Sequence, residues 1–483
     1  MRANSGTGFG KTRYEAGFVP TIPKTVKQPM RATPLRVLVC PPCGASWMST
    51  LAIGIDFGTT NSSVARATGP GEIDLARFPY MGGSTDAYRS LLYLEQVKDR
   101  GVNRIKSWSG PAAIEEYLSA ETKGRLVQSL KSFLSSRSLK STDVFGRRMT
   151  IEDLIARILR DLREKAEIQF GAKIHTAVVG RPVRFVGADK EEDNGFAEER
   201  LRAAFKLAGY ETVEFELEPV AAAYYYESTL DHDELILIGD FGGGTSDFSL
   251  LRVGPGIRGL GRTPADVLGN SGIGLAGDAF DAQIVRNLVS PALGRGSSAR
   301  SMNKVLPAVP NWVYAKLEHW HHLSFLRTNS VINMLNSSKA EAFEPEKIAA
   351  LVHLIQENLG YDLHRAVQKV KRDLSENTIA QFRFSDGVIE IEATVERTAF
   401  EDWIAEELAK IEACIDSLMA ASGAGTKDVD MVFLTGGSSF VPAVRGIFET
   451  RFGAGKIRAG NEFTSVARGL ALTAAARAPG TRA

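Results

Sequence analysis

The 483-residue chain is 44% hydrophobic and 24% charged, which fits a globular protein with a large buried core and excludes fibrous and low-complexity chains. Its formal net charge of +1 combines a basic segment, residues 1–47, with a body of net charge −5, so the body is not expected to bind nucleic acid. No run approaches the roughly 18 apolar residues of a membrane-spanning helix, so no membrane partner is expected either. Three cysteines predict no disulfide framework and favour a reducing, cytoplasmic setting.

Residues 1–47 differ in composition from the rest of the chain. They are rich in Gly, Pro, Thr and basic residues, and they show neither helical nor strand periodicity. Two interpretations follow: a disordered tail, or an upstream extension of a gene whose natural start is Met48. A transit peptide stays open as a third, because the segment is basic and poor in acids, although its serine content is low.

The body opens with a predicted hairpin. Residues 51–55 form an apolar strand, a glycine-containing tip follows, and residues 61–66 form the second strand. Apolar spacing and turn residues then predict, in chain order, helices at 107–118, 126–135 and 151–170, a buried strand at 176–179, and helices at 197–207 and 220–227.

A second hairpin is predicted at 235–252. After it we expect a loop at 254–277, a helix at 278–289, loops at 294–301 and 336–344, helices at 348–359 and 363–374, paired strands at 382–384 and 388–394, a long helix at 400–419, a strand at 431–434, a glycine turn at 435–439, and helices at 444–452 and 465–476. Because strands alternate with helices throughout, the fold class is α/β, with each lobe a sheet flanked by helices.

The two hairpin tips are near copies of each other. Asp56-Phe57-Gly58 returns 184 residues later as Asp240-Phe241-Gly242, again between two apolar runs. A repeat at this distance suggests two similar lobes that face each other across a cleft. A structural hairpin is the simpler explanation for either copy alone, but the duplication argues against it.

The tips carry the chemistry of a phosphate site. Glycines let the backbone approach phosphate oxygens, and successive N–H groups at such a turn bind anions. Phosphates would repel the carboxylates unless a cation lay between them, and magnesium fits because it takes carboxylates through its water shell. The threonines that add hydroxyls are Thr59, Thr60 and Thr245, and the aspartates are Asp56, Asp240 and Asp247.

Two segments also match motifs of other protein classes. Asp-Phe-Gly also marks protein kinases, but the chain has no His-Arg-Asp catalytic loop upstream. Residues 272–277 match the dinucleotide-binding fingerprint in spacing. With no clear strand before them and no acidic residue about twenty positions later, they are predicted to form a loop.

Together these motifs resemble the actin-like ATPase superfamily, and within it the seventy-kilodalton heat-shock (DnaK-type) chaperones. Residues 53–64 and 238–250 resemble the first and second phosphate motifs, and residues 434–442 resemble the adenosine motif. Residues 218–223 resemble the first connecting helix, and 275–281 resemble a motif of the second lobe. The resemblance covers about residues 51–475.

The resemblance implies a two-lobed fold with duplicated ribonuclease-H-like lobes around a nucleotide cleft. Lobe I would be residues 48–229, lobe II residues 230–457, and residues 458–483 a C-terminal helix that returns to lobe I. The implied activity is hydrolysis of ATP to ADP and phosphate with magnesium, coupled to a change in the angle of the cleft.

The resemblance also assigns roles to single residues. Lys131 falls at the catalytic lysine, Glu218 at the carboxylate near the attacking water, and Thr245 at a group that orients that water; Asp240 belongs to the same catalytic set. The residues expected to position hydrated magnesium are Asp56, Asp240 and Asp247. Those expected to bind the nucleotide are Gly58, Thr59, Thr60, Asn61, Gly242, Gly243, Gly244, Thr245, Lys371, Arg372, Ser375, Gly436, Gly437, Ser438 and Phe440.

Three residues depart from the family pattern and put base affinity in question. Gln368 stands where the family usually has Glu, Phe440 where an Arg stacks on adenine, and Phe463 where an Asp approaches the nucleoside. Phe440 could still stack on a purine. The sequence also shows no leucine-rich linker, β-sandwich peptide-binding domain or helical lid after residue 475, which is similar to the short YegD-type branch.

The expected partners are client proteins and a co-chaperone or exchange factor, with a monomeric state. Two alternatives remain within the superfamily. A small-molecule kinase would transfer phosphate to a sugar or acid, and an actin-like scaffold would assemble with nucleotide.

Overall fold

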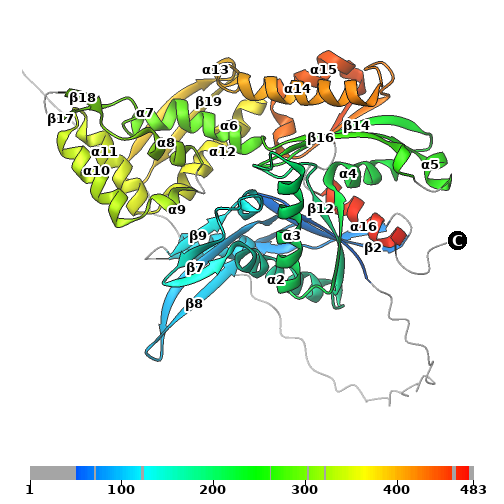
Figure 1. Cartoon of the computed structure of the whole chain (residues 1–483), viewed down its shortest axis with the longest axis horizontal. Coiled ribbons are helices and arrows are strands. Elements are labelled where there is room, and N and C mark those ends of the chain that lie inside the picture. Colours follow the sequence, from blue (N-terminus) through cyan, green and yellow to red (C-terminus); the bar gives the residue numbers. More distant parts are fainter. Residues whose placement is uncertain are drawn as a thin grey trace, which may run out of the picture. The chain divides into compact units, whose positions relative to one another are not determined.

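The computed structural model describes residues 51–69, 72–120, 124–260, 263–301, 304–319, 322–459 and 464–477. Thr50–Ala483 form one compact unit, drawn as a ribbon in Figure 1. The predicted tail, residues 1–47, lies outside the described residues, and so does Phe463. None of the helices in the described ranges is both long enough and apolar enough to span a bilayer.

The first predicted hairpin forms the centre of a mixed sheet. β1 (Ala52–Phe57) and β2 (Asn61–Gly69) pair antiparallel, with Asp56 opposite Ser63. The strand order is β13-β12-β1-β2-β3, with β6 also paired to β2. β12 runs parallel to β1 and to β13. The other strands are β3 (Glu72–Leu75), β6 (Tyr88–Arg89), β12 (Thr176–Arg181) and β13 (Thr212–Leu217).

The second hairpin forms the centre of a second sheet with the same plan. β14 (Glu234–Phe241) and β15 (Ser246–Val253) pair antiparallel, with Asp240 opposite Asp247. The order is β16-β15-β14-β21-β22, again three antiparallel strands followed by two parallel ones. The others are β16 (Val267–Ile273), β21 (Met431–Thr435) and β22 (Ile457–Ala459). The predicted duplication, the hairpins and the mixed α/β fold class are confirmed.

Two helices lie between the sheets. α16 (Ser465–Arg477) packs on β1 and β2, and α4 (Glu218–Glu227) packs on α16, β14 and β15. Their backbones touch: a Cβ added to Gly469 would lie 1.7 Å from the carbonyl oxygen of Ala221. Glycine at this position therefore sets how closely the last helix approaches the centre of the molecule.

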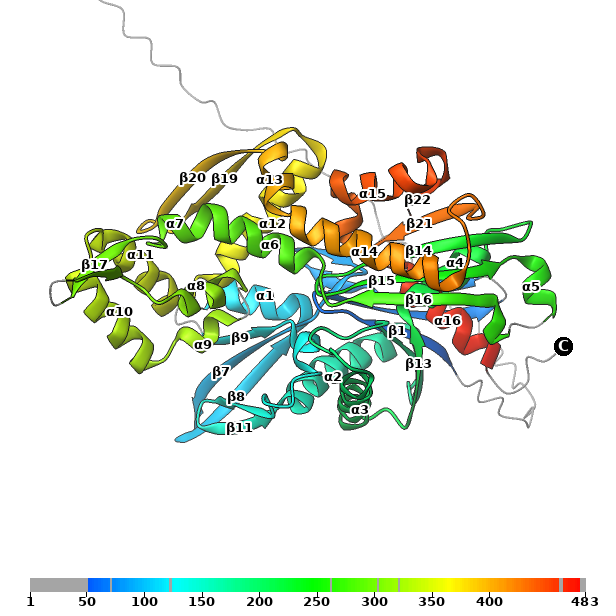
Figure 2. The ribbon, with the colours of Figure 1, turned by 45° about the horizontal axis from the view of Figure 1, so that its top comes forward.

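Longer helices cover the outer faces (Figure 2). α2 (Ile151–Phe170) and α3 (Glu191–Leu207) share a buried apolar core with β1 and β12. α14 (Ala405–Ser422) and α15 (Pro442–Phe452) pack beside the second sheet. α2 has the bounds predicted from sequence because Thr150 and Asp153 form a reciprocal capping box and Gly171 ends it in the left-handed conformation.

Further helices and strands lie beside each of the two sheets. Beside the first sheet lie β4 (Phe78–Tyr80), β5 (Gly83–Thr85), β7 (Leu91–Asp99), β8 (Val102–Ser109), α1 (Gly110–Ser119), β9 (Arg125–Gln128), the 3₁₀ turn η1 (Leu130–Phe133), β10 (Ser141–Val144) and β11 (Arg147–Thr150). Beside the second lie α5 (Pro255–Leu260), η2 (Pro264–Asp266), α6 (Gly277–Ile284), the π-turn η3 (Val285–Val289), α7 (Ser290–Ala292), β17 (Ser298–Ser301), β18 (Lys304–Pro307), α8 (Asn311–Glu318), α9 (Leu323–Leu326), α10 (Asn329–Glu341), α11 (Pro345–Gln356), α12 (Gly360–Glu376), β19 (Ile379–Ser385), β20 (Glu390–Glu396), α13 (Arg397–Trp403), η5 (Gly437–Phe440) and η6 (Ala454–Lys456).

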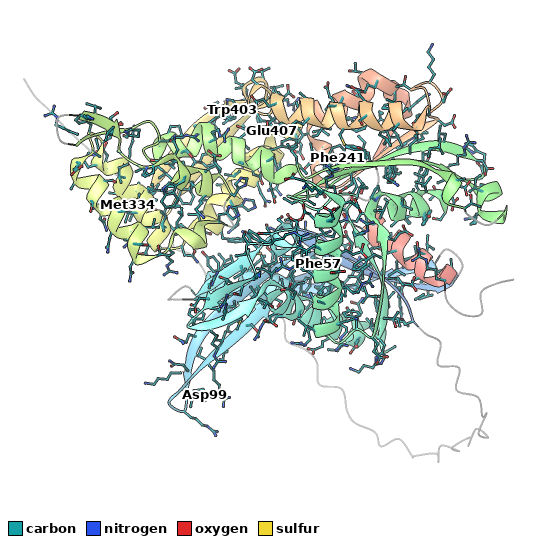
Figure 3. The ribbon with its side chains drawn as sticks, in the orientation of Figure 1. Phe57, Asp99, Phe241, Met334, Trp403 and Glu407 are labelled. Atoms are coloured by element: carbon teal, nitrogen blue, oxygen red, sulfur yellow. The ribbon has the colours of Figure 1, made fainter. Side chains whose placement is uncertain are left out.

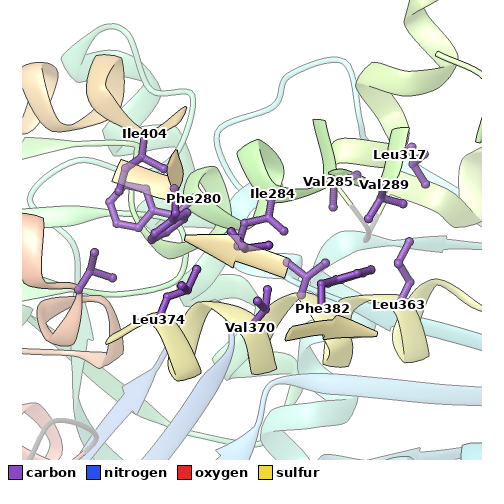
Figure 4. Close-up of a cluster of buried hydrophobic side chains, with 14 of the residues drawn as sticks. Phe280, Ile284, Val285, Val289, Leu317, Leu363, Val370, Leu374, Phe382 and Ile404 are labelled. Carbon is purple, nitrogen blue, oxygen red and sulfur yellow. The ribbon is translucent and has the colours of Figure 1, made fainter. Parts of the chain in front are cut away.

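Two of these helices, α6 and α12, pack against each other in the core beside the second sheet. Phe280 and Ile284 of α6 face Val370 and Leu374 of α12 across a layer of apolar side chains (Figure 4). All four side chains are buried. This packing fixes α12, which carries several of the predicted nucleotide-binding residues.

Several predicted elements differ from the structure. Residues 126–135 were expected to be helical, but they form β9 and the turn η1. The expected loop 254–277 contains α5 and the sheet strand β16, and the expected loops 294–301 and 336–344 contain β17 and the C-terminal part of α10. The expected helix 400–419 is divided between α13 and α14 at Ile404. β9 and β16 form strands because their pairing with neighbouring strands overrides the helix or loop preference of the local sequence.

Candidate active site

The two hairpin aspartates reach the same space because side chains alternate along a strand. On β1, three apolar side chains pack toward α2 and α3, so Asp56 faces the opposite side, where α16 lies. On β14, two isoleucines pack toward α4 and α16, and Asp240 continues that face. Phe57 and Phe241, which end these strands, are buried and are labelled in Figure 3. Both carboxylates therefore point between the sheets.

A cleft of about 300 Å³ lies between the hairpins. Both tips, the start of α4, the turn η1, α12 and the turn before η5 contribute to its lining. The predicted site residues that line it are Asp56, Gly58, Thr59, Thr60, Asn61, Lys131, Glu218, Asp240, Gly242, Gly243, Thr245, Lys371, Arg372, Gly436, Gly437 and Ser438. Gly244, Asp247, Ser375 and Phe440 lie outside this lining.

The tips approach each other closely. A Cβ added to Gly243 would lie 2.4 Å from the hydroxyl oxygen of Thr60, and one added to Gly244 would lie 3.3 Å from that of Thr59. A side chain at Gly243 would therefore clash with the opposite tip, so glycine lets the two loops flank one small ligand. Within the second tip, the N–H of Gly242 donates to the carbonyl oxygen of Thr245 at 3.0 Å.

Lys131 enters the cleft from the turn η1. Ser129, just before the turn, has φ 51°, a left-handed conformation that reverses the chain after β9. The Lys131 ammonium pairs with Glu218 at 2.5 Å, and both side chains are 7% exposed. Burial alone would lower the pKa of Lys131, but Glu218 and Asp56 outweigh it and the pKa is raised. The lysine is therefore held in its charged form.

The carboxylates around Lys131 are crowded. Burial and the charge of Glu218 raise the pKa of Asp56 to about 7. The pKa of Asp240 is raised well above its usual value by burial, Glu218 and Asp56. The pKa of Asp247 is raised to about 7, mainly by burial and Glu218. Four acids thus share one ammonium in a place with little water.

Asp247 lies beneath the cleft wall and has a different environment. Its Oδ1 accepts hydrogen bonds from the backbone N–H groups of Val183, at 2.7 Å, and Arg184, at 3.3 Å. Its Oδ2 is buried without a hydrogen-bond partner among the described residues. Asp247 therefore joins β15 to the loop after β12, and its predicted role in holding magnesium stays a prediction.

This donor set fits a hydrated divalent cation. The excess of buried carboxylates and the unpartnered oxygen of Asp247 are features that positive charge would stabilise. In the described ranges, no three His, Cys, Asp or Glu side chains are arranged to hold an ion directly. Contact between a magnesium ion and the aspartates through the ion's own waters stays a prediction.

The wall opposite the phosphate tips is built by α12. The Lys371 ammonium pairs with buried Asp281 at 2.6 Å and donates to the carbonyl oxygen of Gly277 at 3.1 Å. Arg372 and Gln368 line the cleft. The Ser375 hydroxyl donates back to the carbonyl oxygen of Lys371 at 3.1 Å, which directs it toward its own helix.

Phe440 is 46% exposed at the end of η5. It is one of the few large apolar side chains left open to solvent in the described part of the chain. Its predicted contact with the base stays a prediction.

Several residues that line the cleft were not predicted from the sequence. Arg89 of β6 donates to the side-chain oxygen of Asn61 at 3.0 Å, and Asp278 opens α6 beside the second tip. Asp281, Gly277 and Val466 also line the cleft. The resemblance of residues 275–281 to a motif of the second lobe was a sequence signal that could have identified Asp278 and Asp281 as site residues. Arg89 had none, because the pairing of β6 with β2 places it here.

The chain was also compared with known proteins. A family model described as Hsp70 protein matches residues 101–299 and 353–483. The chloroplastic heat shock 70 kDa protein 7 of Arabidopsis thaliana is 26% identical over 409 residues, which covers 81% of this chain and 48% of that relative. The chain therefore spans about half the length of the curated relative that it matches.

Proposed function

Because this chain belongs to the Hsp70 protein family, we propose that it binds ATP in the cleft between its hairpins and hydrolyses the terminal phosphate slowly. Its mixed α/β architecture with two sheets is the actin-like ATPase fold of that family. Proteins of the family bind ATP or ADP together with magnesium. The observation that carries the proposal is the convergence of both tips and Lys131 on one cleft.

The tips are the proposed phosphate-binding elements. Backbone N–H groups of Gly243–Thr245 and the hydroxyls of Thr59, Thr60 and Thr245 would donate to phosphate oxygens from both sides. The close approach of Gly243 and Thr60 supports a ligand held by both loops at once. Removal of the terminal phosphate would then loosen the link between the sheets and change the cleft angle.

Lys131 and Glu218 are the proposed catalytic pair. With a phosphate in place, the Lys131 ammonium would contact the terminal phosphate and stabilise the charge that develops as the bond to the leaving oxygen breaks. Glu218 would orient the attacking water and hold the lysine charged. Thr245 would present its hydroxyl to the same water.

Magnesium would be held through its water shell by Asp56 and Asp240, with Asp247 behind them. When bound, the ion would screen phosphate charge and fix the geometry of the terminal phosphates. The crowding of these carboxylates supports this assignment, because an ion would offset the burial and the neighbouring negative charge that raise the pKa values of Asp56 and Asp240.

The wider role that we propose is a chaperone-like switch. A partner that prefers one cleft angle would be bound or released as ATP is hydrolysed. Client proteins and an exchange factor are the partners typical of the family. A monomeric state, a cytoplasmic location and placement in the short YegD-type branch all stay predictions.

ATP hydrolysis by the purified chain tests the proposal. We expect magnesium-dependent release of phosphate at a rate that Glu218→Gln lowers strongly. Faster transfer of the phosphate to a sugar or acid than to water would favour a kinase instead. ATP-dependent sedimentation would favour a scaffold.

A further inference from the structure

A second cavity lies beside the cleft and has no role in the proposed hydrolysis. Its volume is about 560 Å³, larger than the roughly 300 Å³ of the cleft itself. Its walls come from β4–β6 and α1 on one side and from α12 and β19 on the other. The two hollows share Arg89, Gln368 and Arg372, so these three side chains form a common wall. We call the second hollow the side cavity.

The lining of the side cavity is strongly cationic. Five basic side chains reach it, against a single carboxylate, Asp362; the five are Arg89, Arg365, Lys369, Arg372 and Arg383. Two of them have acidic partners that do not themselves line the cavity: Lys369 pairs with Asp373 at 2.6 Å, and Arg383 with Glu392 at 2.8 Å. Such exposed pairs are weak and exchange readily for a better anion.

The remaining cations are less well neutralised. Arg365 is 4.0 Å from Asp362, at the outer limit of an ion pair, and its side chain is 55% exposed. Arg89 donates to a neutral amide, that of Asn61, and the nearby carboxylate of Asp278 offsets part of its charge. Gln368, in the common wall, carries no charge. The cavity therefore presents a positive field that extends to the mouth of the cleft.

The floor of the side cavity is rigid. Tyr361 of α12 packs with Ile114 and Tyr117 of α1 in one buried cluster, and the Tyr117 hydroxyl donates to the carbonyl oxygen of Asn358 at 2.6 Å. α1 and α12 are both visible in Figure 2. Two of the guanidinium groups, those of Arg365 and Arg372, are thus carried by a helix that is already packed against α1, which lowers the entropic cost of binding an anion.

We propose that the side cavity binds a polyphosphate chain, either free or attached to the nucleotide in the cleft. Guanidinium groups bind phosphate oxygens in a bidentate manner. A polyphosphate offers only acceptors, which suits a lining made mainly of donors. An acidic peptide would also bring backbone N–H groups, for which the lining offers few acceptors. The space exceeds the needs of a single phosphate and lies in the usual range for ligand pockets.

The test uses tripolyphosphate as the probe, with the cleft saturated by magnesium and ADP. Calorimetry should show binding to the full chain and a loss of about tenfold in affinity for the double variant Arg365→Gln, Arg383→Gln. Neither residue lines the cleft, so the affinity for ADP should change by less than about twofold. The matched control is Arg104→Gln, which changes an exposed arginine of β8 that pairs with Asp99 of β7 and should have no effect.

Two further arms identify the source of the polyphosphate. If the polyphosphate is attached to the nucleotide in the cleft, diadenosine tetraphosphate should bind more tightly than ATP. This difference in affinity should disappear in the double variant. If tripolyphosphate alone depends on the two arginines, the free polyanion is the ligand.

Three outcomes would overturn the proposal: full competition of tripolyphosphate by ADP, equal binding by the double variant, or equally tight binding of pentaglutamate. Failure to bind ADP would instead count against the proposed function, and tripolyphosphate titrations without ADP would still test the two arginines.

Discussion

The proposed phosphate end of the cleft and the region proposed to hold the base are built in opposite ways. At the phosphate end, Lys131 and Glu218 are each 7% exposed and are locked together at 2.5 Å. At the base end, Phe440 is 46% exposed and the Ser375 hydroxyl turns back to its own helix. Buried charges act strongly because little water screens them, whereas exposed contacts are weak. In the proposed function, hydrolysis therefore depends on buried charged groups, and ligand selectivity depends on a few exposed side chains.

The largest effect should come from removing the ammonium at the phosphate end. We expect Lys131→Ala to lower ATP turnover about 100-fold or more, because the charge acts on the transition state, while ATP affinity changes only a few-fold. Single-turnover hydrolysis and nucleotide titration measure the two quantities. Lys106→Ala is the matched control, because it removes the same charged group from an exposed position on β8. Full hydrolysis by Lys131→Ala would remove this lysine from the mechanism.

A smaller effect is expected for the metal. Asp240→Asn keeps the shape of the side chain but removes one of the carboxylate charges. Affinity for magnesium-ATP should fall about tenfold, while affinity for metal-free ATP should change little, because the raised pKa of Asp240 already reduces its negative charge when no cation is bound. Titrations with and without EDTA compare the two. Equal losses in both would argue against a cation at this position.

At the base end, removing Phe440 should matter less. If the ring stacks on a purine, Phe440→Ala should weaken ATP binding about three- to fivefold, in line with a stacking energy of roughly 1 kcal/mol. Turnover at saturating ATP should not change. Comparison with the binding of tripolyphosphate, which has no base, isolates the contribution of the ring. An unchanged affinity for ATP would place the base away from Phe440.

The smallest effect is expected in the pH dependence of stability. The pKa values of Asp56 and Asp247 are raised to about 7, so the folded state keeps protons that the unfolded state releases near pH 4. The free energy of unfolding without metal should therefore decrease as pH rises from about 4 to about 7. Urea denaturation at several pH values measures the slope, and Asp56→Asn should flatten it. A slope of opposite sign would show that these acids are ionised in the folded state.

Much of the phosphate end could be predicted from sequence because its residues belong to local patterns. The hairpins follow from alternating apolar runs on either side of glycine. The strand period alone places Asp56 on a defined face of β1 and Asp240 on a defined face of β14. α2 could be predicted in full because its apolar spacing and its caps agree. Lys131 came from the family resemblance, since residues 126–135 were wrongly expected to be helical.

The remainder depends on contacts between distant parts of the chain. β16 looked like a loop because it contains glycines, yet Gly272 is required: a Cβ there would lie 2.6 Å from Oδ1 of Asp247, its partner on β15. Arg89 reaches the cleft through strand pairing, and no local pattern marks it. Local sequence cannot encode such proximity, so the side cavity could be found only in the structure.

The position of α16 has a consequence for synthesis on the ribosome. β1 is the first and α16 the last of the described elements to be made, yet α16 packs on β1 and α4 through Gly54 and Gly469. A nascent chain that has emerged only as far as β22 thus exposes one face of its earliest sheet. The centre of the compact unit is completed only when α16 has emerged, so premature termination before residue 464 should leave a product prone to aggregation.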